Sequence, residues 1–464
     1  MRIWLIALLA TLLAAPAAAD DRGDVWFRIL GPSGQLIGWQ HEVFTASATG
    51  FEAVRERDLA YRIDGHAPTR QNIRVIRAWD KDRRFKRLAI ETSSNGSPPR
   101  LREIFGPGAT SRSAPPADAE MGDSESLIEL EKRLHRSAAG TPFYEYDPPS
   151  RTYLKIEWRD GASTAKQSSK PITLIAWRGD QLGIAWTISL NDEGKIVRAE
   201  QPLPGSAMVF ERADGPVIMG NMQSVPHQML RSPFVIGHAA LRGHIRYQIG
   251  LPAILRNVLP NTGEQTWRAE SGTMQLDICT SCGPGLSTDP NELATWRKPT
   301  KWLQSDAPAL QSAVRRIAVM KAPERSRMKL LGKMARERLS GIDYDGHYSA
   351  LQAWKRRAGD CTEDAALYAA LARAAGFPAR VASGLVYTRE RYHGAQNAFL
   401  PHSWVLAYVD GKWESFDISI SSFDTTHIAL TIGDGEPGPI ASATQMSGLI
   451  ELQSMTEVRT RPAS

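Results

Sequence analysis

The chain has 464 residues, of which 42% are hydrophobic and 23% charged, a composition that excludes a largely disordered or fibrous protein. At roughly 150 residues per domain, this length suggests two or three domains. The 56 Lys and Arg residues exceed the 50 Asp and Glu residues by only six. Since no run of five basic residues occurs, a nucleic-acid partner is not expected.

The first 19 residues have the pattern of a secretory signal peptide. Arg2 precedes the apolar run 3–13, and three alanines, 17–19, form a small-residue cleavage site before Asp20. An uncleaved membrane anchor is the alternative, but the apolar run is shorter than the roughly 20 residues that a spanning helix needs. We expect cleavage after Ala19 and a periplasmic or secreted mature protein without an integral membrane segment.

Residues 20–290 are expected to be rich in β-strands, because short alternating runs are separated by turn residues. Two hairpins are predicted, at 73–90 and at 172–190. Between them, the Gly-, Pro- and Ser-rich stretch 106–123 could separate two subdomains. A capping-box pattern after this stretch predicts a short helix that begins near Ser126.

The cysteines are informative because exported proteins usually pair them, and this chain has three. Cys279 and Cys282 can form a local disulfide, which leaves Cys361 as a free thiol. Zinc at the close pair would need distant histidines, since His238 and His244 have no metal-clip spacing. A redox centre is also an alternative, but the following Gly-Pro-Gly breaks the helix on which such a cysteine usually lies. We favour the disulfide.

Residues 291–464 are expected to form a second domain in which helices precede strands. The best-defined helix begins at Cys361, with Asp360 as N-cap and Glu363 completing a capping box, and it ends before Gly376. A cysteine at a helix N-terminus lies beside unpaired backbone N–H groups, which favour a thiolate and can bind a developing oxyanion.

A hairpin after this helix brings a histidine and an aspartate together. If Asp410-Gly411 is a two-residue turn, its register makes His402 and Asp417 diagonal neighbours on one face, roughly 7 Å apart at the backbone. A carboxylate in contact with an imidazole fixes its tautomer, as the acid does in a catalytic triad. No comparable argument selects His347, His393 or His427, and no turn places an acid opposite the last.

These residues lie in a pattern that resembles the transglutaminase-like superfamily, in particular its bacterial secreted members. The resemblance covers about 349–419 and is carried by Gly359-Asp-Cys-Thr362, Gly376-Phe-Pro-Ala-Arg380, His402-Ser-Trp404 and Trp413-Glu-Ser-Phe-Asp417. It implies a papain-like α+β domain, with the cysteine on a helix packed against an antiparallel sheet. It also implies that Cys361 is the nucleophile, His402 its base and Asp417 the orienting acid.

Animal cross-linking members of this superfamily use calcium, but no acidic loop here has the spacing of a calcium site. We therefore expect no metal and no cofactor. The predicted function is thiol-dependent acyl chemistry on amide bonds of a protein or peptide, of the peptidase, amidase or transglutaminase type. A non-catalytic periplasmic binding or assembly protein with a vestigial domain is the alternative, against which the intact Cys, His and Asp argue.

Two further expectations concern the site. The amino-terminal region should supply partner or substrate contacts and no catalytic groups. The pKa of Cys361 should fall from its ordinary value near 8.5 to roughly 6, through the helix terminus and a protonated His402 held by Asp417.

Overall fold

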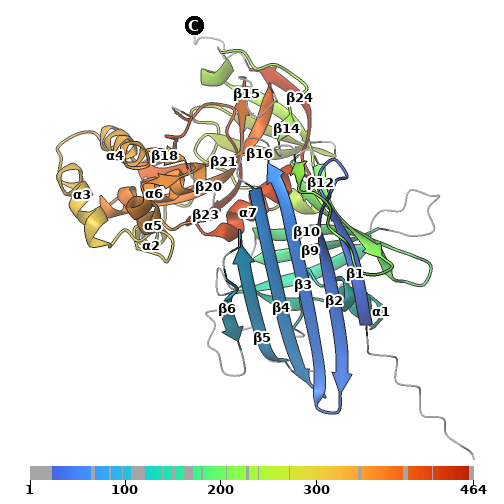
Figure 1. The fold of residues 1–464 in the computed structure, drawn as a ribbon. Helices are drawn as coiled ribbons and strands as arrows, with labels where there is room; N and C mark the ends of the chain where they lie inside the picture. Colours follow the sequence, from blue (N-terminus) through green and yellow to red (C-terminus); the bar gives the residue numbers. More distant parts are fainter. Residues whose placement is uncertain are drawn as a thin grey trace, which may run out of the picture.

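The computed structural model describes residues 23–458, with gaps (Figure 1). The gaps are 64–67, 83–84, 97, 106–120, 137–140, 148–151, 161–170, 179–180, 205, 226–228, 239, 271, 343–346, 390–395 and 421. The expected signal peptide, 1–19, lies outside the described residues. Within the described ranges, no helix is long and apolar enough to cross a membrane. The fold is mixed but strand-rich, with 45% strand and 22% helix.

The amino-terminal part forms one large sheet. Its strands run in the order β6-β5-β4-β3-β2-β1-β12-β11-β10-β9-β8-β7, and β13 pairs in parallel with β3. The bounds are β1 (Gly23–Leu30), β2 (Leu36–Ser47), β3 (Gly50–Ile63), β4 (Pro68–Asp80), β5 (Phe85–Ser94), β6 (Arg100–Phe105), β7 (Phe143–Asp147), β8 (Thr152–Asp160), β9 (Ile172–Arg178), β10 (Gln181–Leu190), β11 (Ile196–Leu203), β12 (Ser206–Ala213) and β13 (Gln223–Val225). Both predicted hairpins are confirmed, because β4 pairs antiparallel with β5 and β9 with β10.

The sheet continues across the stretch 106–123, of which 106–120 lie outside the described residues. β1 pairs antiparallel with β12, which joins the strands that precede this stretch to those that follow it. The strand order therefore does not reflect a division into two subdomains at this point.

The large sheet curls around the predicted helix, α1 (Leu127–Arg136). Alternate residues of β2 are buried, as expected for a strand with one face inward. In the core, Leu127 and Leu130 of α1 pack in one cluster with Phe27 and Trp186, which come from opposite halves of the sheet. Burial of these apolar side chains supplies the main stabilisation of this part.

A second sheet combines strands that are far apart in the sequence. Its order is β16-β17-β15-β24, with β15 (Ile245–Gly250), β16 (Gln265–Glu270), β17 (Thr273–Ile278) and β24 (Glu451–Glu457). β24, near the end of the described chain, pairs antiparallel with β15. Strand pairing thus crosses the boundary expected at 290–291.

The third sheet carries the candidate site. β14 (Leu230–Arg231), β21 (Ala398–Val409), β20 (Ala379–Thr388) and β23 (Ile428–Gly433) are neighbours in that order, and β22 (Lys412–Phe416) also pairs with β21. The helices of this region are α2 (Pro290–Thr295), α3 (Pro308–Ala318), α4 (Glu324–Arg338), α5 (Ala350–Arg356), α6 (Cys361–Ala374) and α7 (Pro437–Ser447). Two short strands, β18 (Gly341–Ile342) and β19 (Ala358–Gly359), and two 3₁₀ turns, η1 (Ala240–Arg242) and η2 (Ala253–Leu255), complete the fold.

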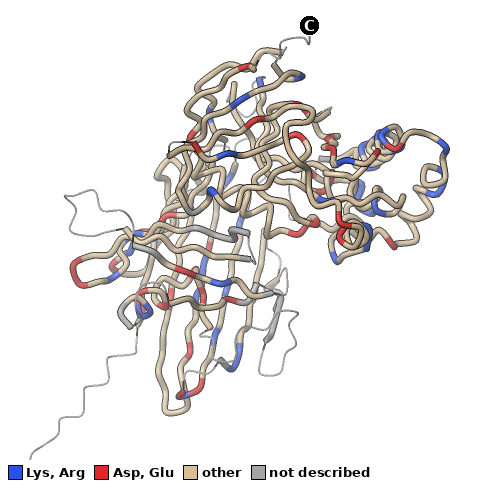
Figure 2. Tube along the Cα trace, turned by 180° about the vertical axis from the view of Figure 1, so that it is seen from behind, with Lys and Arg blue, Asp and Glu red and all other residues tan. Residues whose placement is uncertain are grey.

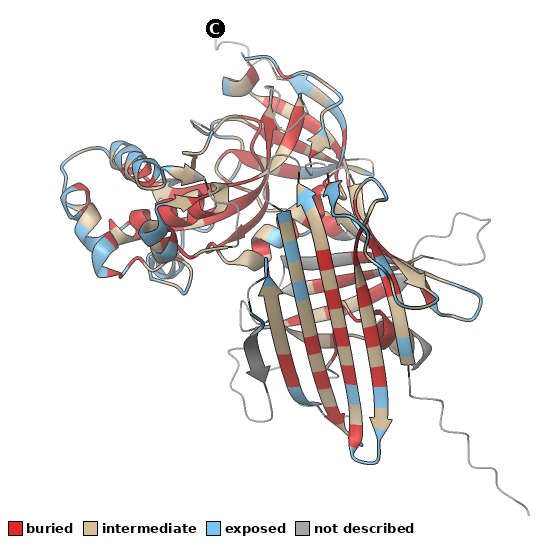
Figure 3. Cartoon of the chain, viewed as in Figure 1, coloured by how far each residue is buried: buried red, intermediate tan, exposed pale blue. Residues whose placement is uncertain are grey.

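Helix α6 is the buried centre of this region. Its residues 365–373 are all buried, between the sheet and the outer helices α3, α4 and α5 (Figure 3). The outer helices carry many Lys and Arg residues on exposed positions (Figure 2). A helix that is apolar on every side requires such an enclosed position, which fixes the place of its first residue, Cys361.

Candidate active site

Cys361 is the first residue of α6, as predicted. The side chain of Asp360 accepts a hydrogen bond from the backbone N–H of Thr362 at 2.7 Å. The side chain of Glu363 accepts one from the backbone N–H of Asp360 at 3.1 Å, which completes the capping box. The helix start is therefore fixed locally, and the free, partly buried thiol of Cys361 lies at it.

The β21–β22 hairpin has the predicted turn. Val409 pairs with Lys412, and both Asp410 and Gly411 have positive φ angles, of 49° and 82°, as a type I′ turn requires. The ladder ends at Phe416, one residue before Asp417. This register brings Nε2 of His402 to 2.9 Å from Oδ2 of Asp417, and both side chains are buried.

The thiol of Cys361 is buried among more carboxylates than expected. Burial is the largest effect that raises the pKa of Cys361 well above its usual range, and the charges of Asp360, Asp364 and Asp417 raise it further. A hydrogen bond from the backbone N–H of Ser403 opposes this rise. The expected lowering to about 6 is thus wrong, because burial disfavours the thiolate and the carboxylates of Asp360, Asp364 and Asp417 add to this effect.

The acidic surroundings also perturb Asp364, one turn along α6. Burial raises the pKa of this carboxyl to about 6, and the charges of Asp417 and Asp360 add to the rise. The hydroxyl of Ser419 donates to it at 2.7 Å, which opposes the rise. Ser419 also donates its backbone N–H to Oδ1 of Asp417 at 2.9 Å, so the two acids are connected through one residue.

His427, which the sequence did not select, shares the carboxylate of Asp417. Its Nε2 lies 3.1 Å from Oδ2 of Asp417, the same oxygen that contacts His402. Its Nδ1 lies 3.1 Å from Oδ1 of Asp424. The imidazole is fully buried between the rings of Trp404 and Phe423.

Attraction between opposite charges shifts the pKa values of His427 and Asp417. Burial alone would lower the pKa of His427, but its bonds to Asp417 and Asp424 raise it to about 9. Burial alone would raise the pKa of Asp417, but His402 and His427 hold it well below its usual range. Asp417 is therefore a carboxylate that accepts from two imidazoles.

A local signal for part of this arrangement exists in the sequence. Oδ1 of Asp424 accepts from the backbone N–H of Thr426 at 2.9 Å, which is the Asx-turn that an Asp-Thr-Thr-His segment favours. This turn brings Asp424 to His427, three residues later. The contact of His427 with Asp417 depends on the position of β23 and has no local signal.

The remaining histidines lie elsewhere. His347 donates from Nε2 to the carbonyl oxygen of Gly435 at 2.8 Å and packs against Trp302. His393 lies outside the described residues. His244 donates to Asp277 at 2.7 Å and so has a structural contact, as expected.

Two groups of side chains in the described ranges have the composition of a metal site. One consists of His402, Asp417 and His427, and the other of His244 with the disulfide-bonded Cys279 and Cys282. In the first group the imidazole Nε2 atoms are engaged with the carboxylate, and in the second the sulfurs are bonded to each other. The atoms that come together in each group are therefore already in contact with each other.

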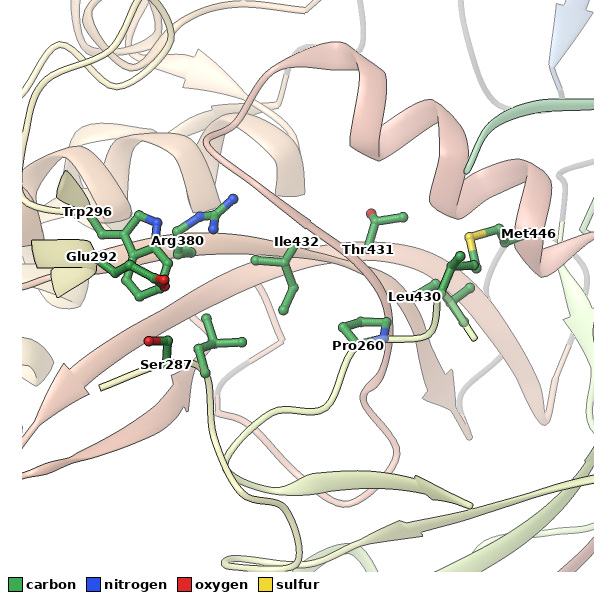
Figure 4. A pocket seen from close by; sticks show the side chains of 11 residues that line it. Pro260, Ser287, Glu292, Trp296, Arg380, Leu430, Thr431, Ile432 and Met446 are labelled. Carbon is green, nitrogen blue, oxygen red and sulfur yellow. The ribbon is translucent and has the colours of Figure 1, made fainter. Parts of the chain in front are cut away.

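A cavity of about 300 Å³ lies beside strands β20 and β23 of the site-bearing sheet (Figure 4). Residues of the 258–296 segment, of β20 and β23, and of α7 line it. Trp296 and Arg380 lie at one end, with the guanidinium 5.4 Å from the ring centre, and Leu430 and Met446 lie at the other. The candidate triad residues are not among those that line this cavity.

Residues 313–418 match the family model of the Transglutaminase-like superfamily. The chain carries a transglutaminase-like domain. The matched segment contains Cys361, His402 and Asp417 and ends before His427. No curated protein matches the chain in sequence.

Three solved structures show a distant likeness to this chain. A protein of Cytophaga hutchinsonii, provisionally named a cysteine protease, is 15% identical, with a TM-score of 0.28, and the match covers 48% of this chain and 88% of that one. A β-barrel-like protein of unknown function from Brucella abortus is 11% identical, with a TM-score of 0.31 and coverage of 41% and 95%. A provisionally named protease of Parabacteroides distasonis is 9% identical, with a TM-score of 0.20 and coverage of 79% and 69%. Similarities this distant do not assign a function to the chain.

Proposed function

We propose that this protein is a periplasmic or secreted enzyme that uses Cys361 as a nucleophile on amide bonds of a protein or peptide. The observation that carries the proposal is the buried contact of 2.9 Å between His402 and Asp417 on the hairpin against which α6 packs. The match to the Transglutaminase-like superfamily across all three residues supports it. If water accepts the acyl group from Cys361, the enzyme is a peptidase or amidase. If an amine accepts it, the enzyme is a transglutaminase.

The tautomer of His402 defines its part in the chemistry. Nε2 donates to Asp417, so Nδ1 is the nitrogen that can take up the thiol proton. Because the pKa of Cys361 is raised, the thiol transfers its proton to His402 as the sulfur attacks the carbonyl carbon. Asp417 stabilises the resulting imidazolium.

The remaining steps use the helix start and the same imidazole. The backbone N–H of Cys361 stabilises the tetrahedral oxyanion, because those of Thr362 and Glu363 bind the side chain of Asp360. The C–N bond then breaks, and His402 gives its proton to the leaving amine. The thioester is released by water or by a second amine, with His402 accepting the proton of the attacking group.

The proposal is tested by turnover and by the reactivity of the single free thiol. The wild-type protein should release amine or ammonia from a mixture of peptides, whereas Cys361→Ser should release none. His402→Ala should change the pH profile with which iodoacetamide alkylates Cys361. Turnover that survives Cys361→Ser would refute the nucleophile, and an unchanged alkylation profile in His402→Ala would refute the base.

A folded, correctly processed protein that shows neither turnover nor a His402-dependent thiol would favour the alternative, a non-catalytic binding or assembly protein. Mass spectrometry of the protein recovered outside the cytoplasm tests its export and the cleavage of the signal peptide, with Asp20 expected at the amino terminus. The division into 20–290 and 291–464 is likewise a proposal, and it concerns the order of elements along the chain, since β24 pairs with β15 across it.

A further inference from the structure

The residues that hold the candidate triad include two that lie far outside the matched family segment. The 262–265 turn leads into β16, whose first residue is Gln265, and it lies in the part of the chain expected to supply partner or substrate contacts and no catalytic groups. Glu264 and Gln265 in this turn are almost fully buried. Each makes a pair of hydrogen bonds to a different strand of the site-bearing sheet.

Glu264 binds β22 two residues before Asp417. Its Oε1 accepts from the backbone N–H of Ser415 at 2.7 Å, and its Oε2 accepts from the hydroxyl of the same residue at 2.9 Å. Among the described strands, β22 pairs only with β21. The carboxylate therefore occupies the open edge of β22 and satisfies an N–H that the sheet leaves unpaired.

Gln265 binds β23 two residues after His427. Its Oε1 accepts from the backbone N–H of Ala429 at 2.8 Å, and its Nε2 donates to the carbonyl oxygen of Ala429 at 2.9 Å. The β20–β23 register shifts between Ser383 and Gly384, and Gly384 is the partner of Ala429. The side-chain amide thus replaces backbone bonds where the ladder is irregular.

The turn itself is held rigidly against β22. A Cβ atom on Gly263 would lie 2.0 Å from the carbonyl oxygen of Trp413, so the close approach requires glycine. The loop closed by the disulfide binds the opposite side of the turn. Its Cys279 donates a backbone N–H to the carbonyl of Glu264 at 3.0 Å, and its Gly283 donates to that of Gly263 at 3.1 Å.

We propose that Glu264 and Gln265 are positioning residues for the candidate triad, since they fix β22 relative to β23 and so keep Asp417 within reach of both His402 and His427. The inference rests on the proposed function and deepens it. Neither residue is bonded to His402 or Cys361; both act through the strand ends that carry Asp417 and His427. Asp417 needs such support because it lies beyond the last paired residue of β22.

The reactivity of the Cys361 thiol should therefore depend on the 262–265 turn. If β22 moves relative to β23 and β21, Asp417 leaves the position in which its Oδ2 lies 2.9 Å from Nε2 of His402, and the imidazolium of His402 is stabilised less. Misplacement of a catalytic group by about 1 Å can cost on the order of a hundredfold in rate. Alkylation of Cys361 at pH 7 should therefore slow about tenfold when either side chain is changed.

The experiment measures the second-order rate of Cys361 alkylation by iodoacetamide from pH 5 to 10, in the full chain. Glu264→Gln removes an acceptor, and Gln265→Leu removes both bonds to Ala429 together with a bond of 2.8 Å to the carbonyl oxygen of Pro260. Gln248→Leu is the matched control, because it removes an exposed bond of 2.8 Å to Glu270 in the same small sheet. Both test variants should move the pH profile in the direction of Asp417→Asn, and the control should follow the wild type.

A milder variant and a double mutant distinguish a role in positioning Asp417 from a general loss of stability. Ser415→Ala keeps the backbone bond to Glu264 and removes only the hydroxyl bond, so it should fold and slow alkylation about threefold. The effects of Glu264→Gln and Asp417→Asn should not add, because one acts through the other. Additive effects, or an unchanged profile in Ser415→Ala and in folded Gln265→Leu, would overturn the proposal.

The outcome is distinguishable from failure of the proposed function. If His402→Ala leaves the alkylation profile unchanged, the triad itself is absent and the proposed function fails. If His402→Ala changes the profile and the turn variants do not, only the positioning role is wrong.

Discussion

Replacement of His427 by glutamine should remove a pH-dependent part of the stability. The pKa of His427 rises from an ordinary value of 6.5 to about 9 on folding. At 1.36 kcal/mol for each pH unit, this rise corresponds to about 3 kcal/mol. The side chain has no exposed area, so solvent does not screen its contacts with Asp417 and Asp424.

The sign of the effect follows from proton binding. Because the folded state holds the proton of His427 more tightly than the unfolded state, this contribution is fully present below pH 6.5. It is lost as the pH rises to about 9. The free energy of unfolding of the wild type should therefore fall between pH 6 and 9.5 by about 3 kcal/mol more than that of His427→Gln.

Urea unfolding at several pH values, followed by tryptophan fluorescence, measures this difference. His41→Gln is a control, since His41 also contacts an aspartate, Asp24, at 2.9 Å, but at the surface of the large sheet. The control should keep the pH dependence of the wild type. Parallel curves for the wild type and His427→Gln would show that His427 does not hold an extra proton in the folded state.

Three other predictions concern the thiol, the disulfide and the domain boundary. The midpoint of Cys361 alkylation should lie above the ordinary value near 8.5, and Asp364→Asn should lower it, because one of the charges that raises the pKa is removed; a midpoint near 6 in the wild type would contradict this. Mass spectrometry should find Cys279 bonded to Cys282, and replacing both by serine should reduce the free energy of unfolding by only about 2 kcal/mol, since the loop spans a separation of three; a stable bridge to Cys361 would contradict the assignment. A 291–464 fragment should aggregate, because it leaves β24 without its partner β15 and exposes apolar residues of their shared core; a soluble fragment with wild-type thiol reactivity would refute this.

The sequence alone was sufficient for the features that depend on neighbours along the chain. The capping box of Asp360 and Glu363 determines where α6 begins, because its hydrogen bonds join residues three apart. The Asp410-Gly411 turn determines the β21–β22 register, since its positive φ angles allow only a tight turn. This register predicted the contact of His402 with Asp417, which lie fifteen residues apart.

Tertiary structure decided the rest of the site. The contact of His427 with Asp417 requires β23 to lie beside β20, and no turn encodes that pairing. The raised pKa of Cys361 likewise depends first on burial and then on carboxylates near the start of α6 and after the hairpin, and these act together only after folding. A local pattern gives no measure of burial or of distant charge, so the helix terminus and a protonated His402 together suggested the opposite shift.

The strand pairs that cross the boundary expected at 290–291 also depend on tertiary structure. A change from alternating to helical periodicity marks where one kind of element follows another, but it does not say which strands pair. β24 pairs with β15 although all the helices from α2 to α7 lie between them in the sequence, and Glu264 and Gln265 reach β22 and β23 across separations of 151 and 164 residues. Such pairings are selected by the shared core and by unsatisfied backbone groups, which exist only once the sheets have assembled.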